Sequence, residues 1–123
     1  MGGGLAVAML TACKEVPGPR YVRGGADADK GLALIKETAC GACHEIPGVD
    51  WPKGRTGPSL VGYDDIGLIA GAVPNTSENL ASFIRNAPEV KPGSTMPPMP
   101  VTQEQARDIA AYLYSLDDGD SNR

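Results

Sequence analysis

The C-terminal part of the chain carries the clearest periodic pattern of hydrophobic and polar residues. Apolar residues recur at helical spacing through residues 103–116, and Thr102 stands where a helix N-cap is expected. The positions on the apolar face are Ala106, Ile109, Ala110 and Leu113. No convincing run of Val, Ile and aromatic residues indicates a strand. The pattern therefore favours helices over strands.

Both ends of the chain differ in pattern from its middle. Residues 5–12 are apolar and uncharged, but far fewer than the roughly 20 residues that span a bilayer as a helix, so they are typical of an export signal. Residues 14–25 are rich in Pro and Gly, which predicts a tether of about 20 Å. The chain thus divides into a signal segment 1–12, an anchor and tether 13–25, one folded domain 26–116 and a polar tail 117–123.

Composition and charge narrow the possible functions. Of the 123 residues, 41% are hydrophobic, but only one is Phe and one is Trp, so the side chains alone give a thin core. A large apolar cofactor would supply the missing contacts. The formal net charge is -4 and no run of Lys or Arg interrupts the acidic balance, which disfavours nucleic acid as a partner.

The strongest chemical signal is the run Cys40-Gly41-Ala42-Cys43-His44, which has the C-x-x-C-H spacing of c-type haem attachment. Two thiols at this spacing add to the two haem vinyl groups as thioethers, and the adjacent imidazole can ligate the iron from one face. A thioredoxin-like redox pair would need a βαβ context, and a zinc site would need further Cys or His ligands nearby. The sequence therefore predicts one covalently bound haem c per chain, held by Cys40, Cys43 and His44.

The second axial ligand of the iron cannot be another His of this chain, because His44 is the only one. The candidates are Met96 and Met99, both in the proline-rich stretch of residues 91–100. Prolines stiffen such a loop, so it could hold a thioether against iron. Another weak donor or an open position are the alternatives.

Taken together, residues 26–116 resemble a class I monohaem cytochrome c. The resemblance rests on the attachment run, on Gly57-Pro58-Ser59-Leu60, on a Pro92-Gly93-x-x-Met96-Pro97 loop, and on helix-like segments at residues 28–35 and 79–86. It implies an all-α fold of a few short helices wrapped around one covalent haem. It also implies that Gly31 and Tyr112 lie where the first and last helices cross.

For the site, the same resemblance implies three further roles. The Pro58 carbonyl would orient His44, Met96 would be the axial ligand, and Ser94 would contact a haem propionate. Residues 69–116 resemble more closely the cytochrome c domain fused to subunit II of caa-type oxidases.

Residues 10–13, Leu-Thr-Ala-Cys, resemble a bacterial lipobox. That resemblance implies that Cys13 becomes the lipid-modified first residue of a protein exported to the outer face of the bacterial membrane. An ordinary cysteine with no lipid is the alternative. Lipid attachment accounts better for Cys13, because it has no partner once Cys40 and Cys43 hold haem.

A haem iron with both axial positions filled suits one-electron exchange without substrate binding. With its only His committed to iron, the chain has no Ser/His/Asp or Cys/His catalytic set, so we expect no enzyme. We expect a membrane-tethered carrier of a respiratory or photosynthetic chain, either alone or as a subunit of a larger complex. Its expected partners are a quinol-oxidising complex or dehydrogenase and a terminal oxidase. The alternatives are a small haem enzyme or gas sensor with an open axial site, and a structural haem subunit.

Overall fold

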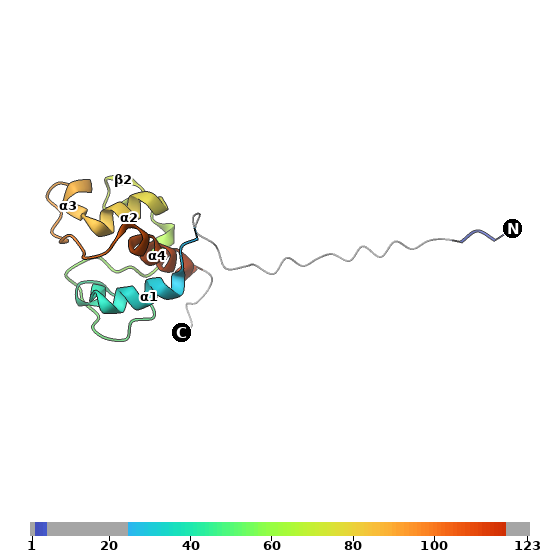
Figure 1. Ribbon diagram of the computed structural model, residues 1–123, viewed down its shortest axis with the longest axis horizontal. Helices are drawn as coiled ribbons and strands as arrows, with labels where there is room; N and C mark the ends of the chain where they lie inside the picture. Colours follow the sequence, from blue (N-terminus) through green and yellow to red (C-terminus); the bar gives the residue numbers. More distant parts are fainter. Residues whose placement is uncertain (1, 5–24, 118–123) are drawn as a thin grey trace.

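A computed structural model describes residues 2–4 and 25–117, and it shows a cluster of short helices joined by long loops (Figure 1). The α-helices are α1 (Ala28–Glu37), α2 (Ser77–Arg85), α3 (Ala87–Val90) and α4 (Gln103–Tyr114). Three 3₁₀ turns accompany them, η1 (Cys40–Ala42), η2 (Tyr63–Asp65) and η3 (Ser115–Asp117). Within the described residues, none of the helices has the length and hydrophobicity that crossing a bilayer requires. The expected all-α fold is confirmed.

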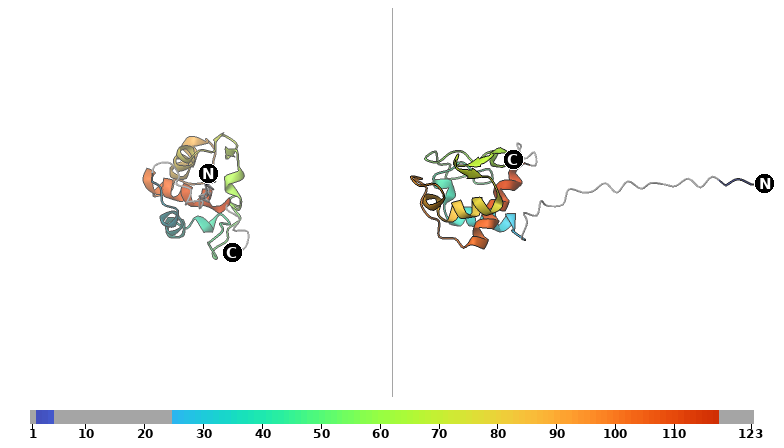
Figure 2. Two further views of the ribbon diagram at one scale, coloured as in Figure 1. Left: turned by 90° about the vertical axis from the view of Figure 1, so that its right-hand side faces the viewer. Right: turned by 90° about the horizontal axis from the view of Figure 1, so that it is seen from above.

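One antiparallel pair of two-residue strands joins the helices, β1 (Leu68–Ile69) and β2 (Val73–Pro74). Figure 2 shows this pair at the edge of the helical cluster. Strands of two residues are too short to produce an alternating pattern, so the pattern of hydrophobic residues does not predict them. Ile69 is buried while Leu68 is exposed, and Ile69 thereby adds one side chain to the core.

Side chains at the helix starts satisfy backbone N–H groups that have no partner within the helix. The Asp27 carboxylate accepts hydrogen bonds from the N–H groups of Asp29 at 2.9 Å and Lys30 at 3.1 Å, which begins α1. Thr102 and Gln105 form a reciprocal capping box at the start of α4. The helix predicted over residues 103–116 therefore begins as expected. Helix α4 ends at Tyr114, and the last two predicted residues belong to the turn η3.

The first and last helices are in direct contact, as the resemblance implied. A Cβ on Gly31 of α1 would overlap the backbone carbonyl of Asp108 on α4. The Asp108 carboxylate accepts a hydrogen bond from the Asp27 N–H at 2.8 Å, and the Tyr112 hydroxyl donates to the Pro47 carbonyl at 2.7 Å. The absence of a side chain at Gly31 is what lets the two helix backbones approach.

Helix α2 packs against α4 on the other side, so α4 has neighbours on two sides. Arg107 of α4 donates two hydrogen bonds to the Glu78 carboxylate of α2, at 2.8 and 3.1 Å. These hydrogen bonds hold the pKa of Glu78 below its ordinary value. Ala81 and Ala110 are fully buried, and such small residues allow close helix packing but leave space elsewhere for a larger group.

We predict that Gly31→Ala destabilises the haem-loaded protein by about 1–3 kcal/mol, because the methyl group must push α4 away from α1. The expected loss is opposite to the gain of about 1 kcal/mol that Gly→Ala gives in an unconstrained helix. Chemical denaturation measures the free energy of unfolding. Gly67→Ala is the control, since nothing lies within 4 Å of its Cβ position. Equal stabilities for the two variants would contradict the close contact.

Candidate functional site

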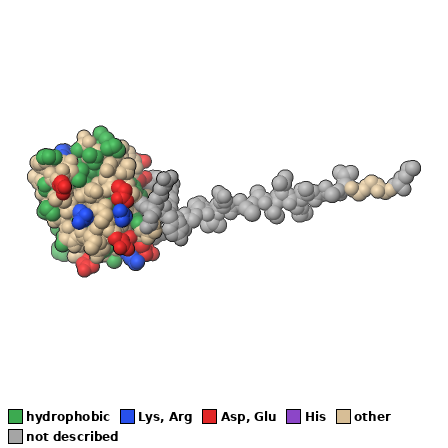
Figure 3. Space-filling model, turned by 45° about the horizontal axis from the view of Figure 1, so that its top comes forward, with side chains coloured by type: hydrophobic (Ala, Val, Ile, Leu, Met, Phe, Trp, Pro, Cys, Tyr) green, Lys and Arg blue, Asp and Glu red, His purple; other side chains and the backbone are tan. Residues whose placement is uncertain are grey.

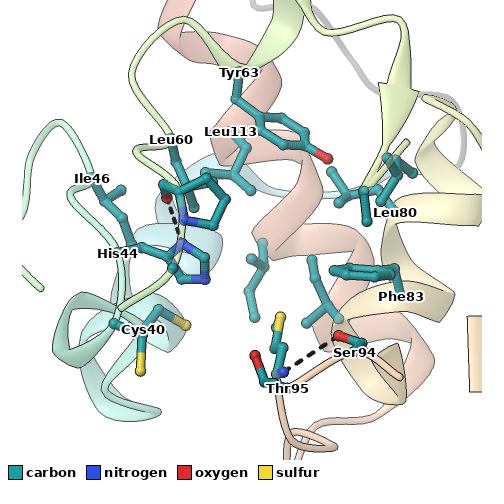
Figure 4. Close-up of a pocket in the computed structure, with 18 of the residues that line it drawn as sticks. Cys40, His44, Ile46, Leu60, Tyr63, Leu80, Phe83, Ser94, Thr95 and Leu113 are labelled. Atoms are coloured by element: carbon teal, nitrogen blue, oxygen red, sulfur yellow. Dashed lines mark hydrogen bonds between the residues drawn. The ribbon is translucent and has the colours of Figure 1, made fainter. Parts of the chain in front are cut away.

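A cavity of about 420 Å³ lies between the helices and is lined mainly by apolar side chains. This volume falls in the range of cofactor sites. Its helical wall consists of Ile35 of α1, Leu80, Phe83 and Ile84 of α2, and Ile109 and Leu113 of α4. Figure 4 shows Leu80, Phe83 and Leu113 on one side and Cys40 and His44 on the other. The cavity is therefore the place where the predicted haem residues and the core meet.

The attachment segment follows α1 and forms one wall of this cavity. Cys40–Ala42 is the turn η1, entered through Ala39 with a φ of 58°. Cys40 and Cys43 both line the cavity. Burial raises the pKa of the Cys40 thiol, whose sulfur lies 3.4 Å from the Thr38 hydroxyl, whereas Cys43 is exposed. One short segment thus presents a half-buried thiol and an exposed thiol to the same cavity.

The His44 imidazole is held by a hydrogen bond to the carbonyl of Pro58. Its Nδ1 lies 2.7 Å from the Pro58 oxygen, and because a carbonyl can only accept, Nδ1 carries the proton. In the neutral ring this leaves a lone pair on Nε2, the form that ligates metals. His44 and Pro58 both line the cavity. The chain therefore presents a nitrogen donor with a fixed tautomer.

Gly57 lets the backbone pass directly beside the His44 ring. A Cβ at Gly57 would lie 2.8 Å from Nδ1 and would overlap Cε1 of the ring. The Gly57 N–H also donates to the Cys43 carbonyl at 2.8 Å. This glycine makes room for the imidazole and ties the loop before Pro58 to the attachment segment.

A loop containing Ser94 and Thr95 forms the wall opposite His44 (Figure 4). Met96 lines the cavity from this loop, and its N–H donates to the Ser94 Oγ at 3.3 Å. Met99 packs against the hydrophobic core instead and is not among the cavity-lining residues that the structure describes. The Met99 N–H donates to the Arg85 carbonyl at 3.2 Å. Of the two candidates, the structure brings only Met96 to the site.

Two further predicted residues, Ser94 and Cys13, differ in whether the structure describes them. Ser94, the predicted propionate contact, lines the cavity. Cys13, the predicted lipid attachment site, lies outside the described residues.

Lys91 and Tyr63 also line the cavity, and the sequence assigned neither of them a role. Lys91 donates from Nζ to the Ala70 carbonyl at 2.6 Å, which connects the methionine loop to the turn after β1. Tyr63 places an almost fully buried phenol at the cavity. Neither belongs to a motif, and only three-dimensional placement identifies them.

The donor set suits a covalently attached haem better than a bare metal ion. Within residues 2–4 and 25–117, no group of three or more His, Cys, Asp or Glu side chains is placed to hold a metal ion. Cys40, Cys43 and His44 therefore do not form a zinc site. They lie instead along a wide apolar cavity, with room kept beside His44 by Gly57, and this arrangement fits a flat apolar macrocycle.

Comparison with known proteins identifies the class. The family model described as Cytochrome c matches residues 28–117, which is most of the chain. The chain belongs to the cytochrome c family, whose members bind haem c covalently and carry electrons.

Individual relatives fall into two groups. The chain is 32% identical over 90 residues to cytochrome c oxidase subunit 2 of Alkalihalophilus pseudofirmus, covering 72% of this chain and 25% of that one. It is 33% identical over 93 residues to the same subunit of Bacillus sp. (strain PS3), covering 72% of this chain and 26% of that one. Cytochrome c-551 of Stutzerimonas stutzeri is 32% identical over 90 residues, covering 72% of this chain and 79% of the relative. The chain thus spans about a quarter of the oxidase subunits and most of the small cytochrome.

The fold also occurs in a solved structure, SoxXA from P. pantotrophus. The TM-score is 0.57 at 21% identity, over 74% of this chain and 82% of that chain. At this identity the likeness concerns the fold alone.

The chain's own residues have distinct tasks toward haem c, which when bound supplies a one-electron Fe(III)/Fe(II) couple. Cys40 and Cys43 would hold it covalently and His44 would ligate its iron from one face. Pro58 keeps the proton on Nδ1 of His44. The apolar walls exclude water, so little solvent reorganises when the charge of the site changes.

We predict that Met96→Ala abolishes the weak far-red absorbance band by which ferric haem with a thioether ligand is recognised. Met99→Ala is the matched control, since it removes the same side chain from the same loop but away from the cavity, and it should keep the band. Absorbance spectra of the two purified ferric variants test this. Loss of the band in Met99→Ala with retention in Met96→Ala would mean that the loop is positioned differently at the iron.

Proposed function

We propose that this cytochrome c is a membrane-tethered one-electron carrier that passes electrons from a quinol-oxidising complex or a dehydrogenase to a terminal oxidase. The observation that supports it most is that one cavity is lined by two potential ligands, His44 and Met96. Met96 belongs to the loop whose residues Ser94 and Thr95 lie across the cavity from His44 (Figure 4). A haem iron with both axial positions filled has no free position for a substrate. Electron transfer is then the chemistry that remains.

The relatives support the respiratory context of this proposal. Two of them are subunits of cytochrome c oxidases, in which the matched region covers only about a quarter of the chain. A domain of this kind would serve as a carrier to an oxidase or as a subunit of a larger membrane complex. We place it on the outer face of the bacterial membrane, where the lipobox-like residues 10–13 would direct it.

Surface charge supports anchoring rather than long-range attraction as the means of finding partners. On the face shown in Figure 3, Lys and Arg are interspersed with Asp and Glu and form no single basic patch. With a net charge of -4, the protein would be steered only toward basic docking surfaces. Confinement to a membrane raises the local concentration of partners without such steering.

A second function, a haem enzyme or gas sensor, would need an open axial position. It would require both Met96 and Met99 to stay off the iron. Met96 lines the cavity, so no described feature favours this alternative over the carrier.

We predict that the mature protein begins at a lipid-modified Cys13 and that Cys13→Ala moves it from the membrane to the soluble fraction. Several acyl chains, at about 0.8 kcal/mol per buried methylene, hold a protein at a membrane where one chain binds only marginally. Mass spectrometry of the mature N-terminus and fractionation of cells measure this. The released variant should also deliver electrons to membranes more slowly at equal concentration.

Lys14→Ala is the control for this experiment, because it changes the neighbouring residue and leaves the thiol in place. It should remain in the membrane fraction. An unmodified N-terminus elsewhere, or equal solubility with and without Cys13, would contradict the tether and leave a freely diffusing or complex-bound carrier.

A further inference from the structure

Tyr63 has a buried side chain whose hydroxyl opens onto the cavity (Figure 4) and has no hydrogen-bond partner among the described residues. Tyr63 is 7% exposed and lines the cavity, and Figure 4 shows its oxygen directed into that space. No side chain or backbone group within residues 2–4 and 25–117 forms a hydrogen bond with it. A cofactor that fills the cavity would shield this hydroxyl from water. Because a buried hydroxyl left unpaired costs about 1–3 kcal/mol, its partner is expected to come from that cofactor.

The surrounding structure fixes the direction of this hydroxyl. The Tyr63 ring packs against the Tyr114 ring with centroids 6.5 Å apart. The Tyr114 hydroxyl donates to Asn75 Oδ1 at 2.5 Å, and Asn75 Nδ2 donates to the Ile66 carbonyl at 2.8 Å. The neighbouring tyrosine is therefore satisfied by the protein and Tyr63 is not. Burial raises the pKa of Tyr63 to about 12, so at physiological pH it is a neutral donor.

The other polar residues of the cavity wall are more exposed than Tyr63. Thr56, Lys91 and Thr95 are exposed, so water satisfies them. Lys91 also donates to the Ala70 carbonyl, and the half-buried Ser94 accepts from the Met96 N–H. Tyr63 is distinguished from them by its burial.

Haem c brings two groups that a phenol can pair with, its propionate carboxylates. They are carried on the pyrroles across the macrocycle from those that form thioethers with cysteine. Figure 4 shows Tyr63 across the cavity from Cys40. We propose that the Tyr63 hydroxyl donates a hydrogen bond to a haem carboxylate and is a positioning residue of the site. This deepens the proposed carrier function but rests on it only through the bound haem, and not on the tether or on Met96.

The hydrogen bond would also affect the redox equilibrium. An ionised carboxylate near the iron favours Fe(III), because its negative charge stabilises the more positive metal. A hydroxyl that donates a hydrogen bond to the carboxylate reduces the negative charge felt at the iron. It therefore weakens the stabilisation of Fe(III) and favours Fe(II). Removing the donor should therefore lower the midpoint potential. We expect a change of up to tenfold in the reduction equilibrium constant, which for one electron corresponds to about 59 mV.

The experiment compares Tyr63→Phe with Tyr114→Phe in the haem-loaded protein. Each variant removes one hydroxyl and keeps the ring, but only Tyr63 faces the cavity. Infrared difference spectra between the reduced and oxidised protein, with haem labelled with ¹³C at its carboxylates, report the hydrogen bonding of those carboxylates directly. Tyr63→Phe should shift the labelled carboxylate band and lower the potential at pH 8, whereas Tyr114→Phe should change neither.

Two results would overturn the assignment: a labelled band in Tyr63→Phe identical to that of the unmutated protein, or an equal shift in both variants.

A peroxidase stain of the denatured protein checks independently that haem is covalently bound in each variant. A negative stain in the unmutated protein would refute the carrier itself rather than this hydrogen bond. Should Tyr63→Phe fail to fold, the unmutated protein provides the test. Its labelled band must shift slowly on transfer to D₂O, and a shift at the rate of solvent-exposed groups would exclude a buried donor.

Discussion

The hydrogen bond between His44 and the Pro58 carbonyl connects the chemistry of this cytochrome to its fold. The distance from His44 Nδ1 to the Pro58 oxygen is 2.7 Å, so the proton stays on Nδ1 and the lone pair of Nε2 is free to bind metal. The bond forms only because Gly57 carries no side chain and its N–H is tied to the Cys43 carbonyl. The loop before Pro58 is thus held by the same segment that supplies the thiols, and the three donors to haem are positioned together.

The rest of the fold leaves and protects the space that this segment faces. Helices α1 and α4 approach closely at Gly31, and the small residues Ala81 of α2 and Ala110 of α4 are fully buried. Bulky side chains such as Phe83 and Leu113 line the cavity. The core that looks thin in composition is complete once haem occupies it, so the stability of the protein is coupled to its cofactor.

The sequence predicts the parts of the site that depend on neighbouring residues. Cys40, Cys43 and His44 are contiguous, and the helix after Thr102 follows from spacing and a capping pair. Tyr63 could not be predicted in the same way, because its burial depends on contact with Tyr114, far along the chain. The sequence likewise cannot decide between Met96 and Met99 as the ligand. Both stand in one proline-rich loop, and only the packing of Met99 on the core separates them.

We propose that the chain itself fills both axial positions of the iron, which would make the protein a carrier rather than a catalyst. The most direct test is the absorbance spectrum of the reduced, haem-loaded protein before and after carbon monoxide is added. A diatomic ligand binds ferrous haem readily where an axial position is open and poorly where a protein ligand holds it. We predict an unchanged spectrum. Formation of a carbon monoxide complex at stoichiometric gas concentrations would contradict the account and indicate an open site.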